Sequence, residues 1–248
     1  MMQLLGHLFT YRLLKSKAYA LLLFSSLLAV QLQAASPLQP LTLTCEYLVN
    51  PLGIRSQKPA LTWTLQAVQR NQRQSAYEVI VGDDLAMVRQ GKGNAWESGR
   101  IMSAQNISIA FEGKPLKPFT RYYWRVKVYN QNGEASDWSE PAWFETAMLK
   151  QSDWKGQWIG DERKQFKKDE DFYSNDPMPL FRKAFNTKKK LQTARLYVSG
   201  VGYYEAYLNG KKISDHVLDP GWTTYRQEVL YVTHDVTSLL QQGQNTLG

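Results

Sequence analysis

The feature that most constrains the fold is the strict alternation of side chains in residues 122–130. One parity carries large apolar and aromatic side chains: Tyr122, Trp124, Val126 and Val128. The other parity carries charge, at Arg125 and Lys127. Successive side chains of a strand point to opposite faces of its sheet, so this run predicts a strand with one buried and one solvated face. A slip of one residue would expose the whole apolar set, which fixes the register.

Shorter alternating runs flank this segment, at residues 61–65, 77–81, 107–111 and 143–146. After residue 36, no stretch keeps a helical period for more than about two turns. We therefore expect a β-sandwich over residues 40–148, similar to the fibronectin type III fold. In that fold Tyr122 would occupy the tyrosine-corner position and Trp63 the place of the core tryptophan.

A second β-unit is expected over residues 153–248, and residues 203–208 are expected to form one of its strands. Asn209-Gly210 is a strong two-residue hairpin signal, and Asp219-Pro220-Gly221 marks another turn. Residues 246–248 look like the opening of a further strand, so we expect this domain to be incomplete at its C-terminus. The predicted fold class is all-β, with two consecutive β-sandwich domains: a fibronectin type III-like one, then a jelly-roll or galactose-binding-like one that is C-terminally truncated.

Cysteine and histidine usage argues against several kinds of chemistry. Cys45 is the only cysteine, so a disulfide within the chain, a cysteine-based zinc site and an iron–sulfur cluster are excluded. It ends an apolar alternating run, which predicts a buried structural thiol. His216 and His234 lie far from any His-x-x-x-His spacing, and His7 belongs to the leader. The sequence therefore does not favour a metal centre built on histidine or cysteine.

Residues 1–35 are typical of a secretory signal peptide. A basic segment with Arg12, Lys15 and Lys17 precedes an apolar stretch at residues 18–30, and Ala34-Ala35 offers a cleavage point. The apolar stretch is shorter than the roughly 18 residues that span a bilayer. We expect an exported protein, periplasmic or secreted and bacterial, with no membrane association after cleavage.

The net charge of +8 does not point to nucleic acid. The lysine clusters at residues 188–190 and 211–212 fall near predicted hairpin tips and sheet edges. Lysines at such positions keep edges soluble. We expect no nucleic-acid partner.

Two stretches of the second unit resemble a known family. Residues 197–210, with the sequence YVSGVGYYEAYLNG, and residues 217–225, with the sequence VLDPGWTTY, closely resemble the N-terminal accessory domain of bacterial α-L-rhamnosidases. Residues 45–53 and 70–77 are similar to the leading sandwich domain of that family. The resemblance covers nearly all of residues 41–248.

The resemblance implies the N-terminal region of an inverting glycoside hydrolase that releases terminal α-L-rhamnose. The family's catalytic carboxylates lie in a large (α/α)6 barrel that follows these modules, so we predict no catalytic residue here. The acidic triplet of residues 169–171 sits among lysines in a loop, as solvated carboxylates do. We expect a non-catalytic fragment of the parent enzyme, inactive alone, whose partners are a rhamnose-containing glycan and the catalytic domain that is missing from this chain. The alternative is a stand-alone carbohydrate-binding or adhesion module.

The candidate site lies in the second unit. Asp219, Trp222 and Tyr225 are the candidate carbohydrate-binding residues, since aromatic rings favour the methyl and C–H face of a deoxy-sugar. No cofactor is expected to be required. The resemblance does imply the option of a calcium ion in this domain, because related accessory modules bind rhamnose with calcium. Its candidate ligands are Asn175 and Asp176, with the backbone near Asp219-Pro220 closing the site from the facing turn. Trp222 and Tyr225 could instead pack against the catalytic barrel and bind no sugar.

Overall fold

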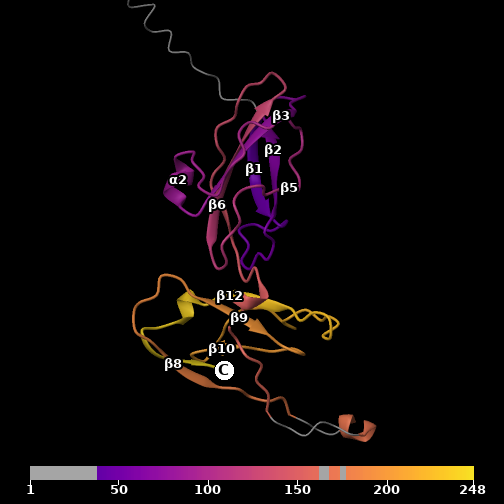
Figure 1. Cartoon of the computed structure of the whole chain (residues 1–248), viewed down its shortest axis with the longest axis vertical. Helices are drawn as coiled ribbons and strands as arrows, with labels where there is room; N and C mark the ends of the chain where they lie inside the picture. Colours follow the sequence, from indigo (N-terminus) through magenta and orange to yellow (C-terminus); the bar gives the residue numbers. More distant parts are fainter. Residues whose placement is uncertain (1–37, 162–167, 174–176) are drawn as a thin grey trace, which may run out of the picture. The chain divides into compact units, whose positions relative to one another are not determined.

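The structure is a computed structural model that describes residues 38–161, 168–173 and 177–248. Its first part contains an antiparallel sheet in the order β1-β2-β5: β1 Leu38–Cys45, β2 Ala60–Ala67 and β5 Ile109–Ala110. A second antiparallel sheet has the order β4-β3-β6-β7: β3 Gln74–Gly82, β4 Trp96–Glu97, β6 Arg121–Asn130 and β7 Ala142–Glu145. These strands run from indigo to magenta in Figure 1, and their inner faces enclose one apolar core, as a β-sandwich requires.

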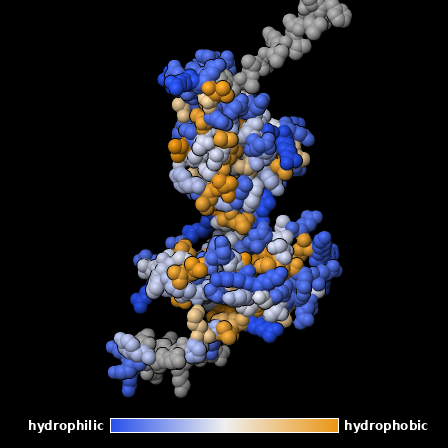
Figure 2. Space-filling model, turned by 180° about the vertical axis from the view of Figure 1, so that it is seen from behind, coloured by the Kyte–Doolittle hydropathy of each residue, from blue (hydrophilic) through white to orange (hydrophobic). Residues whose placement is uncertain are grey.

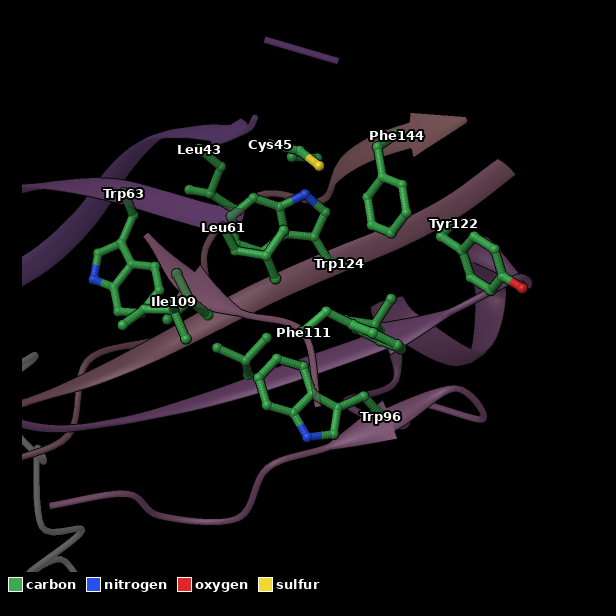
Figure 3. Close-up of a cluster of buried hydrophobic side chains, with 14 of the residues drawn as sticks. Leu43, Cys45, Leu61, Trp63, Trp96, Ile109, Phe111, Tyr122, Trp124 and Phe144 are labelled. Atoms are coloured by element: carbon green, nitrogen blue, oxygen red, sulfur yellow. The ribbon is translucent and has the colours of Figure 1, made fainter. Parts of the chain in front are cut away.

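The alternation of β6 appears in the structure as the sequence predicts. The even-numbered residues from Tyr122 to Asn130 are buried, and the odd-numbered ones are only partly so. Trp124 and Trp63 are fully buried, from opposite sheets (Figure 3). The indole nitrogen of Trp63 donates to Oε1 of Gln74 at 3.0 Å. The predicted core role of Trp63 is therefore confirmed.

Two further predictions for the sandwich hold. The hydroxyl of Tyr122 accepts a hydrogen bond from the backbone N–H of Lys117 at 3.0 Å, which is the contact of a tyrosine corner. The thiol of Cys45 is fully buried in the core, where loss of solvation raises its pKa. A thiol in such surroundings packs as an apolar group and is inert.

A short helix, α2 Leu85–Arg89, interrupts the strands of the sandwich. Asp84 caps it, because its carboxylate accepts from the backbone N–H groups of Ala86 and Met87. No helix in the part of the chain that the structure describes is long and apolar enough to cross a membrane.

The second part, drawn in orange to yellow in Figure 1, is also built on antiparallel strands. Within the described residues, one sheet has the order β11-β10-β13-β8: β8 Lys183–Thr187, β10 Tyr207–Leu208, β11 Lys211–Lys212 and β13 Gly243–Leu247. The other pairs β12 Tyr231–Asp235 with β9 Arg195–Ser199. Single 3₁₀ turns occur at η1 Gln151–Asp153, η2 Asp169–Tyr173 and η3 Thr237–Leu239. Together with the sandwich, these sheets confirm the all-β class.

The hairpin between β10 and β11 forms where the sequence predicts it. Asn209 and Gly210 both have positive φ, 54° and 78°, as a two-residue turn of this kind needs. The expected strand over residues 203–208 is much shorter, covering only Tyr207–Leu208. Tyr204 instead makes an isolated bridge with Asp219. The predicted final strand exists as β13, which pairs with β8 on one side and β10 on the other.

Glu145, at the end of β7, is a buried carboxylate shared by two arginines. Its Oε2 accepts from Arg121 at 3.0 Å, and its Oε1 accepts from Arg195, at the start of β9, at 2.6 Å. The Arg195 side chain is 9% exposed and also pairs with Asp235 at 3.0 Å. A charge removed from water in this way is tolerated only with such partners.

We predict that Trp63→Ala lowers the free energy of unfolding by about 3–5 kcal/mol, since it empties a core site of its largest ring. Chemical denaturation of the full chain measures this. Trp158→Ala is the matched control, because that indole is 66% exposed; its cost should stay within about 0.5 kcal/mol. A Trp63 cost below about 1 kcal/mol would contradict the core assignment.

We predict that Glu145→Gln lowers the free energy of unfolding by about 3 kcal/mol, because it removes the buried negative charge that Arg121 and Arg195 share and leaves Arg195 with Asp235 alone. The control is Glu228→Gln, which breaks an ion pair of Arg55 and Glu228 whose side chains are 65% and 51% exposed. That change should cost less than about 0.5 kcal/mol. Equal costs in the two variants would show that burial does not set the strength of the Glu145 pairs.

Candidate functional site

The connection between β11 and β12 carries all three of the predicted carbohydrate-binding residues. Its backbone is fixed at Asp219, whose carbonyl accepts from the N–H of Tyr204 at 2.9 Å. The carboxylate of Asp219 accepts from Nδ1 of His216 at 2.9 Å. Asp219 is therefore held at both its backbone and its side chain.

Trp222 and Tyr225 lie together on this connection. Their rings are parallel to within 6°, with centroids 6.2 Å apart, and Tyr203 meets Trp222 edge-on at 6.0 Å. The hydroxyl of Tyr225 accepts from the backbone N–H of Gly202 at 3.0 Å, which ties the ring to the opposite loop. Trp222 remains 72% exposed. We call Tyr203, Trp222 and Tyr225 the aromatic cluster; its rings pack on one another, and Trp222 presents an apolar face to solvent.

Exposed aliphatic side chains lie near the aromatic cluster in the sequence. They belong to Val201, Val217 and Leu218. Apolar areas separated by hydrophilic ones are visible on the face of the molecule shown in Figure 2. Exposed apolar groups that gather in one place mark a surface that binds something.

The candidate calcium ligands Asn175 and Asp176 lie outside the described residues. The third element of that expectation was the backbone near Asp219-Pro220. There, the carbonyl of Asp219 already accepts from Tyr204.

The structure brings together two histidines that the sequence analysis left apart. His216 and His234 have ring centroids 5.5 Å apart, with the Asp219 carboxylate next to both. Its Oδ2 lies 2.9 Å from Nδ1 of His216 and 3.8 Å from Nε2 of His234. One ligand atom of each residue falls within 4.8 Å of the other two. We call these three residues the His–Asp cluster.

The members of the His–Asp cluster differ in solvation. The side chain of His234 is 3% exposed, whereas that of His216 is 51% exposed. Burial lowers the pKa of His234, more than the nearby Asp219 raises it. The Tyr204 hydroxyl lies 2.9 Å from Nε2 of His234, and burial raises the pKa of that phenol. His234 is thus favoured as a neutral imidazole within a hydrogen-bonded network.

Spacing in the sequence could not reveal this cluster. A His-x-x-x-His motif detects ligands on one turn of helix, whereas these histidines come from a loop and from β12. The sequence contained only a weaker indication of the cluster. His216 lies just before the predicted Asp-Pro-Gly turn, and His234 lies at the strand that follows this turn.

The structure also contains a groove of about 710 Å³ that the sequence did not predict. Aromatic side chains from Trp154, Trp158 and Tyr231 line it, with Arg55 and Glu228 as charged neighbours. The rings of Trp154 and Tyr231 are 5.8 Å apart. Its residues come from four separate parts of the sequence, so no local motif could mark it.

Two family models match the chain. The model described as "Rha78A-like, N-terminal immunoglobulin domain" matches residues 40–150, and that of the "Alpha-L-rhamnosidase N-terminal domain" matches residues 189–248. The second match contains the aromatic cluster and the His–Asp cluster.

Curated relatives match only over part of their length. One α-L-rhamnosidase of Formosa agariphila is 36% identical over 239 residues, which is 94% of this chain and 26% of the relative. A second one from that organism is 35% identical over 213 residues, 80% of this chain and 22% of the relative. The chain thus spans about a quarter of the length of these relatives.

Solved structures of similar proteins support the fold. An α-L-rhamnosidase from Dictyoglumus thermophilum aligns with a TM-score of 0.77 and 36% identity, over 84% of this chain and 24% of that one. The α-L-rhamnosidase from Aspergillus terreus aligns with a TM-score of 0.67 and 26% identity, over 85% and 23% of the two chains. Taken with the two family models, these matches show that the chain corresponds to the N-terminal region of α-L-rhamnosidases, with the immunoglobulin-like N-terminal domain followed by the N-terminal domain of that family.

Proposed function

We propose that this chain is the non-catalytic N-terminal region of an exported α-L-rhamnosidase, in which it supports the catalytic domain and presents a carbohydrate-binding surface. One observation carries the proposal. Relatives named α-L-rhamnosidase align with 80–94% of this chain, yet the aligned part is only 22–26% of their own length. Most of each relative therefore lies outside the region that this chain represents.

The ion pairs formed by the carboxylates support a non-catalytic role. Inverting hydrolysis of a glycoside needs an acid and a base about 6.5–9.5 Å apart across a sugar pocket. Glu145, the most deeply buried carboxylate of the sandwich, is held by two arginines. In the second domain, Glu205 pairs with Lys212 and Asp235 pairs with Arg195. Carboxylates engaged in this way serve structure rather than proton transfer.

The aromatic cluster supports the carbohydrate-binding role. Trp222 projects into solvent while Tyr225, held by Gly202, stacks beside it. A sugar's C–H face can pack on such rings, and a carboxylate such as Asp219 can accept from its hydroxyl groups. The ligand class that suits an apolar platform is a deoxy-sugar, such as a terminal L-rhamnose on a glycan.

Export is part of the proposal. Residues 1–35 have the charge and hydropathy pattern of a signal peptide, and the part of the chain after them has a single cysteine. Its function would then be carried out in the periplasm or outside the cell.

We predict that the purified full chain does not hydrolyse aryl α-L-rhamnosides, because it aligns with only 22–26% of its relatives and the carboxylates named above are held in ion pairs. The absorbance of the released aryl chromophore measures the hydrolysis rate, and buffer without protein is the control. Turnover above the buffer rate that a Glu or Asp substitution within the chain abolishes would contradict the non-catalytic assignment.

We predict weak, saturable binding of L-rhamnose to the full chain, which Trp222→Ala abolishes and Tyr225→Phe retains, since phenylalanine keeps the ring. Isothermal titration calorimetry measures both. Trp158→Ala serves as the control, because that exposed tryptophan belongs to the separate groove. Absence of binding by folded protein would leave only the supporting role, in which Trp222 packs against the remainder of the enzyme.

A further inference from the structure

We propose that His216, Asp219 and His234 bind one divalent transition-metal ion of the zinc class. The ligand set is two imidazole nitrogens and one carboxylate oxygen, which are the groups that zinc accepts besides thiolate. The site would fasten the loop that carries the aromatic cluster to strand β12. This inference does not depend on the proposed function.

The distances between the ligand atoms suit such an ion. In a tetrahedral zinc site with bonds of roughly 2.0–2.1 Å, two ligand atoms lie about 3.3 Å apart. In the His–Asp cluster, Oδ2 of Asp219 is 2.9 Å from His216 and 3.8 Å from His234, and all three ligand atoms lie within 4.8 Å. These separations lie on either side of the ideal value. Small side-chain rotations would place all three atoms around one centre.

Two of the three ligands are held in place by the fold. His234 belongs to β12 and is in register with Leu196 of β9. Asp219 is fixed by its backbone bridge to Tyr204. Ligands positioned by backbone pairing lose little conformational entropy when an ion binds, which favours affinity.

The third ligand gives the ion a route from solvent. His216 lies three residues before Asp219 on the loop, and its side chain is half exposed. An ion could therefore reach the buried His234 along the His216 side of the cluster.

Tyr204 completes the surroundings of the ion. Its hydroxyl lies 2.9 Å from Nε2 of His234, the nitrogen that would bind the ion. Metal binding would therefore replace the hydrogen bond between the two side chains. Tyr204 would then be a polar neighbour of the ion outside the ligand set. A metal site depends on such partners outside the ligand set.

The choice of zinc-class metal over calcium follows from the ligands. Calcium takes six to eight oxygen ligands, whereas this cluster offers two nitrogens and one carboxylate. The ion inferred here is therefore distinct from the calcium ion that the family resemblance suggested, both in ligands and in chemistry.

The test uses the full chain, purified without a histidine tag, treated with chelator and titrated with Zn²⁺ alone. We expect saturable 1:1 binding, measured by competition with a chromophoric chelator. His216→Gln should weaken it at least about tenfold, because loss of a ligand costs no less than loss of an outer partner. Asp215→Asn, an exposed neighbour, and His7→Gln are the controls, and both should bind like the original chain.

A second measurement does not depend on any variant. In chain labelled with ¹⁵N-histidine, Zn²⁺ should shift the ring signals of His216 and His234 and leave that of His7 unchanged. Absence of 1:1 binding, unchanged affinity in folded His216→Gln, or Zn²⁺ shifts confined to His7 would each overturn the proposal. The His–Asp cluster would then be a hydrogen-bond network only.

Discussion

The pairing of β6 with its neighbours is the constraint on which the first domain depends. β6 pairs along most of its length with β3 and also with β7, so its two faces are fixed. The inner face supplies the fully buried Trp124, and the outer face supplies Arg121 to the buried Glu145. Glu145 also forms an ion pair with Arg195 of β9. The outer face of β6 is therefore connected, through Arg121 and Glu145, to the β9–β12 pair. A change of register in β6 would lose the core and the ion pairs together.

Much of the fold could be predicted from local patterns. The alternation of apolar and charged side chains predicted strand β6, and the Asn209-Gly210 pair predicted the hairpin of β10 and β11. Trp63 lies in the core, as the sequence also predicted. The expected strand over residues 203–208 was too long, because its apolar residues serve different partners. Tyr204 bridges to Asp219, and Tyr203 packs on Trp222. A pattern of hydrophobicity cannot distinguish a strand from a loop whose aromatic rings pack on another loop.

The candidate site was only partly accessible from the sequence. The Asp-Pro-Gly-Trp turn and its aromatic residues could be read directly, since they lie within seven residues of one another. The His–Asp cluster could not, because it needs β12 to pair with β9 and the loop to bridge to Tyr204. The groove beside Trp154 likewise depends on segments far apart in the chain. Sites of this kind follow from tertiary structure, and spacing rules for helices do not find them.

Whether the aromatic cluster is the glycan-binding surface can be tested by one spectrum. The chain has eight tryptophans, and each gives its own indole N–H signal when labelled with ¹⁵N. Titration with L-rhamnose is predicted to shift the signal of the exposed Trp222 and to leave those of the buried Trp63 and Trp124 unchanged. Shifts confined to Trp154 and Trp158 would move the binding surface to the groove, and no shift at any tryptophan at saturating sugar would contradict a carbohydrate-binding role for the aromatic cluster.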